Sequence, residues 1–440
     1  MHSKPNYKPK VNVITLGCSK NTWDSEVLMG QLVANQVPVT HEQEVFKGDT
    51  VVINTCGFID RAKQESIDTI LEWADEKKKG NINKLIVMGC LSERYRAELQ
   101  AEIPDVDAFF GTRELPEILA KLNIDYKYEL VGERLLTNPS HYAYFKIAEG
   151  CDRPCSFCAI PLMRGQHVSF PIESLVSQAE RLSANGTKEL ILIAQDLTYY
   201  GLDIYKERTL AKLIDSLAQV NGIEWIRLQY AYPSQFPMDI LPIIREYQNV
   251  CKYIDMPLQH STDNMLKIMR RGITTRRTEE VVDRIRTEVP GIAIRTTLLT
   301  GHPGETEEDH QHLLGFIQKH KFERLGVFQY SHEENTHAGT LNDDVPEEIK
   351  ERRHDEIMEI QSSISMSHNL AKIGTSQRVL VDRVEGQYYI GRTQYDSPEV
   401  DNEVLIKMEI ENPTQIGEFV QVRVLDAMEY DLFAEIEKVS

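Results

Sequence analysis

The chain of 440 residues repeats one pattern along most of its length, an apolar β-rich run followed by a stretch with helical periodicity. This alternation is typical of α/β folds, because parallel strands need a crossover connection and the crossover is usually a helix. Two blocks show the pattern, residues 11–127 and residues 138–368, whereas residues 370–438 carry short strands between turn residues. We therefore predict an α/β protein of three domains with these boundaries.

In the first block, three apolar runs each end in a cysteine. The runs VNVITLGC, TVVINTC and LIVMGC end at Cys18, Cys56 and Cys90. Continuous apolar strands fit a parallel sheet that is covered on both faces. Ligands of open α/β sheets bind beyond the carboxyl ends of the strands, so we expect all three cysteines along one edge. A buried cysteine is often only a small apolar residue, but three at the same structural position favour a ligand site.

The second block contains six strand patterns in series: AYFKIA, ELILIAQD, WIRLQYAY, KYIDMPLQ, IAIRTTLLTG and RLGVFQYS. Six β/α units predict an open, partial barrel of the TIM type, with its functional residues at the C-terminal mouth. The last block instead has five short strand patterns separated by Gly, Pro, Asn or Asp. These predict a small antiparallel β barrel.

A cysteine triplet follows the first strand of the predicted open barrel. The stretch EGCDRPCSFCAIP contains Cys151, Cys155 and Cys158. Thiolates are soft ligands that suit iron–sulfur clusters, and three can hold three irons of a four-iron cluster, which leaves the fourth iron open. Zinc is the structural alternative, but such a site needs four ligands, and this loop has no fourth Cys or His.

Composition sets the expected compartment and partners. No apolar run approaches the roughly 18 residues of a membrane span, and no apolar signal-peptide region follows MHSKPNYKPK. We predict a cytoplasmic protein without membrane association, in which an odd total of seven cysteines argues against a disulfide framework. The net charge of −19 disfavours broad binding of nucleic acid and suits a basic partner.

The triplet has a family resemblance. Its spacing C-x₃-C-x-aromatic-C, made by Cys151, Cys155, Phe157 and Cys158, resembles the motif of the radical S-adenosylmethionine (SAM) superfamily. The resemblance implies that the three cysteines hold a 4Fe-4S cluster, that SAM binds the open iron, and that Phe157 lies near the adenine. It also implies reductive cleavage of SAM to a 5′-deoxyadenosyl radical.

From about residue 11 to residue 438, the chain resembles the methylthiotransferases, which combine such a barrel with an N-terminal cysteine domain and a C-terminal TRAM barrel, an OB-like fold. This resemblance implies a second, auxiliary 4Fe-4S cluster on Cys18, Cys56 and Cys90, where sulfur is attached and methylated. Cys251 matches neither motif and is predicted to be a core thiol.

Polar residues at the ends of later strands are weaker candidates, and none is assigned as catalytic. The resemblance of these stretches to family motifs suggests SAM or substrate contacts for Gln195, Asp196, Arg295 and Glu305. Other roles stay open, because the first two can cap the next helix and GHPGE also fits a tight turn. We interpret His260 and His302 as ordinary polar residues rather than metal ligands.

Two branches of the methylthiotransferases differ in substrate, one modifying an adenosine of tRNA and the other an aspartate of the small-subunit ribosomal protein twelve. The stretch PLQHSTDNMLKIMRRG resembles the ribosomal-protein branch, because the tRNA branch usually has Ser-Gly where this chain has His260. Residues 370–440 contain seven Lys/Arg and fourteen Asp/Glu, a net charge of −7. An RNA-binding TRAM domain would offer a basic face, whereas an acidic one attracts a basic protein.

We therefore predict a radical SAM methylthiotransferase that modifies the β-carbon of an aspartate of this ribosomal protein, free or in the ribosome. The resemblance implies that one SAM methylates sulfur at the auxiliary cluster and a second yields the radical, with both clusters facing one cavity. A sulfur donor and a reductant such as flavodoxin or ferredoxin are the expected partners. The alternatives are a tRNA methylthiotransferase and a non-catalytic iron–sulfur factor that docks on ribosomes.

Overall fold

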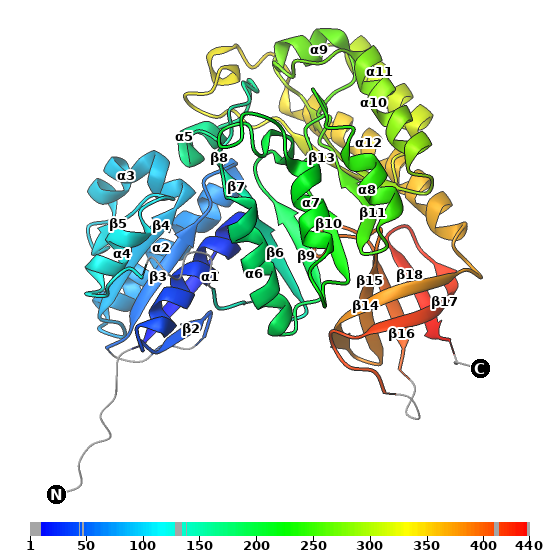
Figure 1. Ribbon diagram of the computed structural model, residues 1–440. Coiled ribbons are helices and arrows are strands. Elements are labelled where there is room, and N and C mark those ends of the chain that lie inside the picture. Colours follow the sequence, from blue (N-terminus) through cyan, green and yellow to red (C-terminus); the bar gives the residue numbers. More distant parts are fainter. Residues whose placement is uncertain are drawn as a thin grey trace, which may run out of the picture. The chain divides into compact units, whose positions relative to one another are not determined.

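The computed structural model describes residues 10–43, 45, 48–127, 134–137, 139–408 and 413–437 (Figure 1). Its internal contacts divide the chain into two compact units. The first contains residues 1–138, 149–152 and 159–167, and the second contains residues 139–148, 153–158 and 168–440. Among the described residues, no helix combines the length and the apolar character that a membrane span needs.

The first unit is built on a five-stranded parallel sheet in the order β2-β1-β3-β4-β5. Its strands are β1 (Val11–Thr15), β2 (Val39–His41), β3 (Thr50–Thr55), β4 (Lys84–Gly89) and β5 (Ala108–Phe109). The helices of this domain are α1 (Ser19–Ala34), α2 (Asp60–Lys78), α3 (Cys90–Glu102) and α4 (Leu115–Lys121). The predicted α/β parallel-sheet domain is confirmed.

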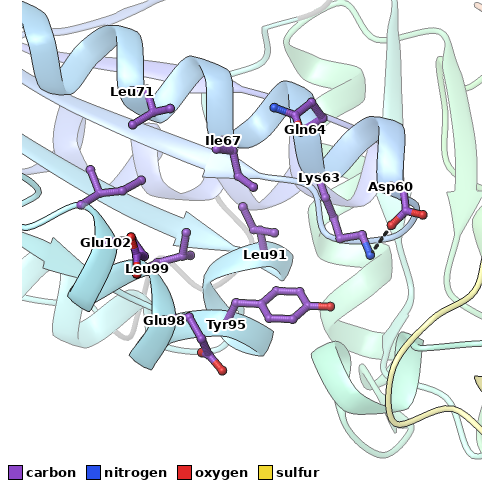
Figure 2. Close-up of a pocket in the computed structure, with 11 residues that line it drawn as sticks. Asp60, Lys63, Gln64, Ile67, Leu71, Leu91, Tyr95, Glu98, Leu99 and Glu102 are labelled. Carbon is purple, nitrogen blue, oxygen red and sulfur yellow. Dashed lines mark ion pairs between the residues drawn. The ribbon is translucent and has the colours of Figure 1, made fainter.

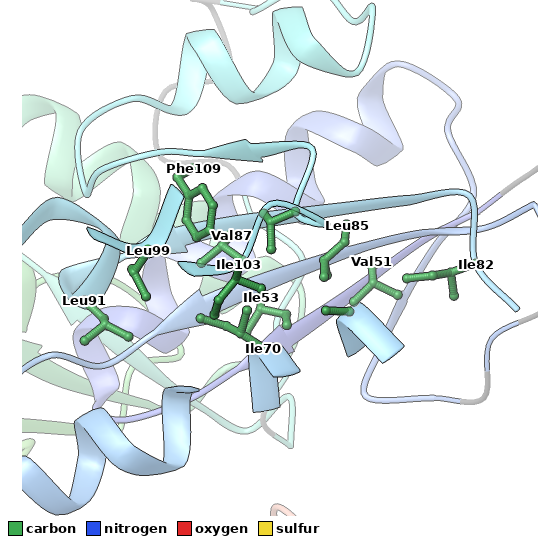
Figure 3. Close-up of a cluster of buried hydrophobic side chains, with 12 residues drawn as sticks. Val51, Ile53, Ile70, Ile82, Leu85, Val87, Leu91, Leu99, Ile103 and Phe109 are labelled. Carbon is green, nitrogen blue, oxygen red and sulfur yellow. The ribbon is translucent and has the colours of Figure 1, made fainter. Parts of the chain in front are cut away.

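Helices cover both faces of this sheet, which explains its continuous apolar strands. Val51 and Ile53 of β3 point to one face, where they pack with residues of α2 and α3, whereas Val52 points to the face of α1 and α4. Figure 3 shows the first of these clusters, in which Ile70 of α2 and Leu99 of α3 pack against the sheet. The two-sided core fixes the strands, so their carboxyl ends form one edge.

The second unit contains a six-stranded parallel sheet in the order β13-β12-β11-β10-β9-β6, which is the predicted open barrel of six β/α units. Its strands are β6 (Tyr142–Lys146), β9 (Glu189–Ile193), β10 (Trp225–Leu228), β11 (Val250–Asp255), β12 (Ala293–Thr300) and β13 (Arg324–Gln329). Its longer helices are α6 (Ile172–Ala184), α7 (Leu210–Ala218), α8 (Ile240–Glu246), α10 (Thr275–Glu288), α11 (Glu307–His320) and α12 (Glu347–Leu370). The shorter elements of the second unit are β8 (Val168–Ser169), η2 (Leu197–Tyr199), α9 (Asp263–Ile268) and η3 (Ala338–Thr340). The short strand β7 (Ala148–Glu149) lies where the chain passes from one unit to the other, and α5 (Ile160–Arg164) belongs to the first unit.

A small closed barrel follows α12 in the order β14-β15-β16-β18-β17. Its strands are β14 (Ser376–Glu385), β15 (Tyr388–Thr393), β16 (Glu403–Lys407), β17 (Phe419–Ala427) and β18 (Asp431–Ile436). Four neighbouring pairs are antiparallel, but β16 and β18 run parallel. The prediction of an antiparallel barrel is thus wrong at one pair, because directions cannot alternate throughout a closed ring with an odd number of strands.

The segment between β15 and β16 connects the closed barrel to the open one through buried ion pairs. Asp396 is fully buried and accepts a hydrogen bond from Nε of Arg324 at 2.9 Å. Asp401 Oδ1 lies 3.3 Å from Nε of Arg295. Both barrels fall in one compact unit, so the predicted boundary near residue 369 stays a prediction.

Candidate functional site

The three N-terminal cysteines lie at the carboxyl ends of three adjacent strands. Cys56 follows the last residue of β3 directly, and Cys90 follows β4 as the first residue of α3. Cys18 follows β1 after two intervening residues and immediately precedes α1. Because β1, β3 and β4 are neighbours in the sheet, the fold places all three at the one edge that the strand pattern predicts.

A close backbone approach at Gly17 and the buried side chain of Asn21 stabilise this edge of the sheet. Gly17 has a φ of 95°, and a Cβ atom added there would lie 2.7 Å from Cβ and 2.9 Å from Sγ of Cys56. Only glycine therefore permits this approach. The Asn21 side chain donates hydrogen bonds to the carbonyl oxygens of Leu16 at 2.7 Å and Thr55 at 3.1 Å, and its Oδ1 lies 3.9 Å from Sγ of Cys90. One side chain thus joins the ends of β1 and β3 beside a thiol.

A buried guanidinium lies at the same edge. Arg164, at the end of α5, places Nη1 at 2.5 Å from Asp24 Oδ2 and at 3.3 Å from Glu149 Oε2, while Nη2 donates to Asn21 Oδ1 at 2.5 Å. Its side chain is only 3% exposed. The segment that forms α5 packs beside Cys90, since Ala159 and Met163 belong to the same apolar cluster as Cys90. Arg164 therefore brings a fixed positive charge to the auxiliary cysteines.

The electrostatic state of the thiols follows from burial and from this charge. Burial raises the pKa of Cys90 to about 12, while the nearby Arg164 partly offsets the rise. Burial also raises the pKa of Cys56, and Arg164 again acts in the opposite direction. These groups are therefore thiols near neutral pH, and a metal that binds them must displace their protons. The guanidinium favours the anionic, ligating form.

The cysteine triplet occupies the loop that follows β7. Cys151 is buried, whereas Cys155 and Cys158 are partly exposed. The backbone N–H of Cys151 donates to the carbonyl of Gly165 at 3.0 Å, and that of Cys158 donates to the carbonyl of Cys155 at 3.2 Å. The second bond closes a tight turn, which brings the last two cysteines of the motif together.

Arg271 and Tyr232 lie beside Cys155, and Arg153 stacks on the same tyrosine. Nη1 of Arg271 lies 3.2 Å from its Sγ, and the hydroxyl of Tyr232 lies 3.5 Å from it. The guanidinium groups of Arg153 and Arg271 lie 3.9 and 4.1 Å from the centre of the Tyr232 ring. Sequence reasoning missed these residues. The available signal was a basic residue inside CDRPC and another in MRRG, but nothing in the sequence pairs the two stretches.

Two of the weaker candidates follow β9. Asp196 caps η2 by accepting a hydrogen bond from the N–H of Thr198 at 2.8 Å, and its Oδ2 accepts one from Nε of Arg153 at 2.7 Å. The cap was the alternative role named for it, and the ion pair ties the cysteine loop to β9. Gln195 precedes it and is partly exposed. A SAM contact for either residue stays a prediction.

The other two candidates lie apart in the second unit. Arg295 of β12 pairs with Asp255 at 3.0 Å and with Asp401 at 3.3 Å. These ion pairs engage it at the junction with the closed barrel, and its contact with SAM or substrate stays a prediction. Glu305 is buried, 3.5 Å from Nε2 of His260 and 3.3 Å from Nη1 of Arg353. It therefore organises the loop after β12.

His260, the residue that distinguishes the two branches, also has a local role. Its Nδ1 accepts hydrogen bonds from the N–H groups of Ser261 at 2.9 Å and Thr262 at 3.2 Å. Nδ1 is thus an acceptor, which leaves the ring proton on Nε2, 3.5 Å from Glu305 Oε1. A side chain in this arrangement orders the start of α9, in agreement with its interpretation as an ordinary polar residue.

Phe157 and Cys251 are both enclosed by the second unit. Phe157 packs against the apolar cluster that contains Met265 and Met269, and its ring centre lies 6.3 Å from that of His302 in an edge-on arrangement. Ser156 Oγ lies 3.0 Å from Nε2 of His302, which fixes the same stretch. A contact of Phe157 with adenine stays a prediction. Cys251 is 1% exposed in an apolar cluster, which confirms the predicted core thiol.

Each group of three cysteines offers the soft thiolate donors that an iron–sulfur cluster takes. In the described part of the chain, no three His, Cys, Asp or Glu side chains gather closely enough to bind one metal ion. A four-iron cluster binds each thiolate at a different iron, so its cysteines need a wider spacing. Three thiols at the sheet edge and three in the β7 loop match that chemistry. Ligation by all six cysteines stays a prediction.

Comparison with known proteins gives the class. A model of the Radical SAM superfamily matches residues 145–317, a TRAM domain model matches residues 373–436, and a model of the uncharacterized protein family UPF0004 matches residues 10–111. A solved structure of the radical S-adenosylmethionine methyltransferase TsrM from Kitasatospora setae has a TM-score of 0.55 at 14% identity, and covers 75% of this chain and 77% of that one. The fold and the cysteine loop thus define a radical SAM enzyme.

Curated relatives narrow the family. A protein named ribosomal protein uS12 methylthiotransferase RimO from Cytophaga hutchinsonii is 60% identical over 438 residues, covering 100% of both chains. A protein of the same name from Flavobacterium johnsoniae is 59% identical over 436 residues, covering 99% of this chain and 100% of its own. The chain belongs to the RimO family of methylthiotransferases.

Proposed function

We propose that this chain inserts a methylthio group at the β-carbon of an aspartate of ribosomal protein uS12. The observation that carries the proposal is the end-to-end similarity, at 60% identity, to a protein named for uS12 methylthiotransfer. The placement of two cysteine triads on the two α/β folds supports it. The similarity covers 100% of both chains, so it is not confined to the segments that carry the cysteines.

Cys151, Cys155 and Cys158 would hold one 4Fe-4S cluster, and Cys18, Cys56 and Cys90 the other. When bound, the clusters and SAM supply a radical that removes hydrogen from the target carbon and a methylated sulfur that takes its place. Arg271, whose Nη1 lies 3.2 Å from Cys155 Sγ, places a positive charge beside that ligand. Arg164 does the same at the auxiliary edge, where its charge lowers the pKa of Cys90 against the effect of burial.

The remaining partners follow from this chemistry. Reductive cleavage of SAM consumes an electron, so a reductant such as flavodoxin or ferredoxin is required, and the inserted sulfur requires a donor. The ribosomal substrate, free or assembled, places the reaction in the cytoplasm. Residues 370–440, with fourteen acidic and seven basic side chains, favour a basic protein over RNA, which argues against the tRNA alternative.

Mass spectrometry of uS12 and tRNA, offered in parallel with SAM and reductant under anaerobic conditions, tests the proposal. We expect methylthio mass on an aspartate of uS12 and none on tRNA. Cys155→Ala should abolish 5′-deoxyadenosine formation. Cys56→Ala should retain it while losing the methylthio product. Cys251→Ala, which removes a thiol from the core, serves as the matched control and should retain both.

Three results would contradict this assignment. If the enzyme modified tRNA instead of uS12, the assignment of uS12 as the substrate would be wrong. If Cys56→Ala still formed the methylthio product, the role assigned to the cluster on Cys18, Cys56 and Cys90 would be wrong. Bound iron without any deoxyadenosine from the wild-type enzyme would favour the non-catalytic ribosome-binding factor.

A further inference from the structure

An open groove of about 700 Å³ lies between α2 and α3 of the first unit. Figure 2 shows side chains of both helices facing it. Leu71 of α2 is 48% exposed, although it is a large apolar residue. The apolar side chains that line the groove are Ile67, Leu71, Leu91, Tyr95, Leu99 and Ile103. A groove of this size and character can take several side chains of an extended or helical segment.

The groove begins beside the auxiliary cysteines. Its α2 wall starts at Asp60, four residues after Cys56, and its α3 wall starts at Cys90 itself. A Cβ atom added at Gly57 would lie 2.8 Å from the backbone nitrogen of Leu91, so the loop that carries Cys56 packs directly on the first turn of α3. A segment lying in the groove therefore leads to the edge where sulfur would be attached.

An interruption of α3 shapes this end of the groove. Tyr95 has φ −124° and ψ 28°, which are not helical values. Its ring centre lies 5.9 Å from Nζ of Lys63 and 4.9 Å from the guanidinium carbon of Arg94. The ring is thus held by two cations beside the groove, and its flat face adds to the apolar lining near Asp60 (Figure 2).

Carboxylates border the apolar floor. Glu98 and Glu102, four residues apart on α3, are exposed and line the groove. Lys63, the one cation of the lining, already pairs with Asp60 at 2.7 Å. Within the described ranges, no cation lies at ion-pair distance from Glu98 or Glu102.

We propose that this groove binds a segment of uS12 that carries both apolar and basic side chains and lies near its target aspartate. The inference rests on the proposed function, because it names where that substrate docks. The apolar floor would take the apolar side chains, and Glu98 and Glu102 would pair with Lys or Arg. A second copy of this chain would bring the same net charge of −19, and RNA would bring phosphates against the carboxylates, so both are disfavoured.

Photo-cross-linking tests the position directly. The full-length holoenzyme carries benzoylphenylalanine at position 71, and the control carries it at Glu117, an exposed residue of α4, which packs on the opposite face of the sheet. Irradiation with purified uS12 should give a uS12 adduct from position 71 and none from position 117. Because Leu71 is half exposed, the substitution leaves the core intact.

Charge reversal tests the energetics with an independent readout. Glu98→Lys combined with Glu102→Lys should raise KM for uS12 about tenfold, lower the association rate and weaken its dependence on salt, as expected for charges at an interface rim. Glu117→Lys combined with Glu180→Lys changes the net charge equally at exposed positions away from the groove and should leave KM within about twofold. Both variants should bind as much iron per chain as the wild-type enzyme. In the absence of uS12, both should also form as much 5′-deoxyadenosine as the wild-type enzyme.

The outcomes separate the two proposals. If wild-type enzyme does not modify uS12, the proposed function fails. The docking site is wrong, while the proposed function stands, if wild-type enzyme modifies uS12 but position 71 gives no adduct with it. The same holds if the double variant at Glu98 and Glu102 has the same KM for uS12 as the control double variant. An adduct from position 71 with a second copy of the chain also overturns the inference.

Discussion

Replacing Asp396 by asparagine should destabilise the second unit, because this carboxylate neutralises a buried arginine between the two barrels. Asp396 is fully buried and accepts hydrogen bonds from Nε and Nη2 of Arg324 at 2.9 and 2.5 Å. Arg324 is itself 5% exposed. Asp396→Asn keeps the shape of the side chain but leaves the guanidinium without its carboxylate.

The size of the effect follows from the burial of both partners. Removing one partner of a buried ion pair costs about 3–5 kcal/mol, because the other charge stays desolvated. Asp401 lies near enough to lessen the loss, since it also helps to raise the pKa of Arg324. We therefore expect the free energy of unfolding to fall by about 3 kcal/mol. The exposed pair of Arg383 and Glu403 at 2.6 Å provides the control, and Glu403→Gln should cost less than about 1 kcal/mol.

The effect should also depend on pH. Burial alone would raise the pKa of Asp396, but the charges of Arg324 and Lys372 outweigh it, so the pKa lies below its usual value. A carboxyl whose pKa is lowered on folding stabilises the protein above its unfolded pKa of about 4, and this contribution is lost as pH falls through the folded pKa. The difference between wild type and Asp396→Asn should thus be constant from about pH 7 to pH 5 and shrink below about pH 4.

Urea unfolding followed by tryptophan fluorescence measures this difference. Trp225 packs edge-on against Phe419 of the closed barrel at 4.7 Å, so its emission reports on the junction. Replacing Trp23 and Trp73, which belong to the first unit, by phenylalanine isolates the signal. A loss below about 1 kcal/mol at pH 7, equal to that of the exposed control, would refute the argument that this pair anchors the closed barrel.

Two further predictions concern the sheet edge that carries Cys18, Cys56 and Cys90. Both are tested by measuring the iron bound per chain in a variant in which Cys151, Cys155 and Cys158 are replaced by alanine, so that only the other three cysteines can bind a cluster. Arg164→Met should lower this iron and cost about 3–5 kcal/mol of stability, because Asp24 and Glu149 lose their buried cation; unchanged iron would show that the charge does not assist the thiolates. Gly17→Ala should lower the iron more than Gly80→Ala, since a Cβ atom at Gly17 meets Cys56 at 2.7 Å whereas one at Gly80 meets nothing within 4 Å, and both have positive φ; equal iron would mean that only backbone strain matters.

Much of this architecture could be read from local sequence patterns. Apolar runs of strand length followed by helical periodicity predicted both parallel sheets, and the turn-rich C-terminal segment predicted the closed barrel. The cysteine spacing needed no tertiary information either, because Cys151, Cys155 and Cys158 lie within eight residues. The edge position of Cys18, Cys56 and Cys90 followed from parallel topology, since strands that run the same way end at the same edge.

Only the tertiary structure decided which side chains surround these cysteines. Arg164 meets Asp24 across 140 positions of the sequence, and Arg271 meets Cys155 across 116. The ion pair between Arg295 and Asp401 could not be predicted from the position of Arg295 on a strand, because Asp401 lies in the distant segment between β15 and β16. Local periodicity reports the faces of strands and helices, whereas a buried charge is fixed by whichever distant partner the packing brings to it. The sequence therefore determined the fold class and the cysteine positions, and the packing determined the charges around them.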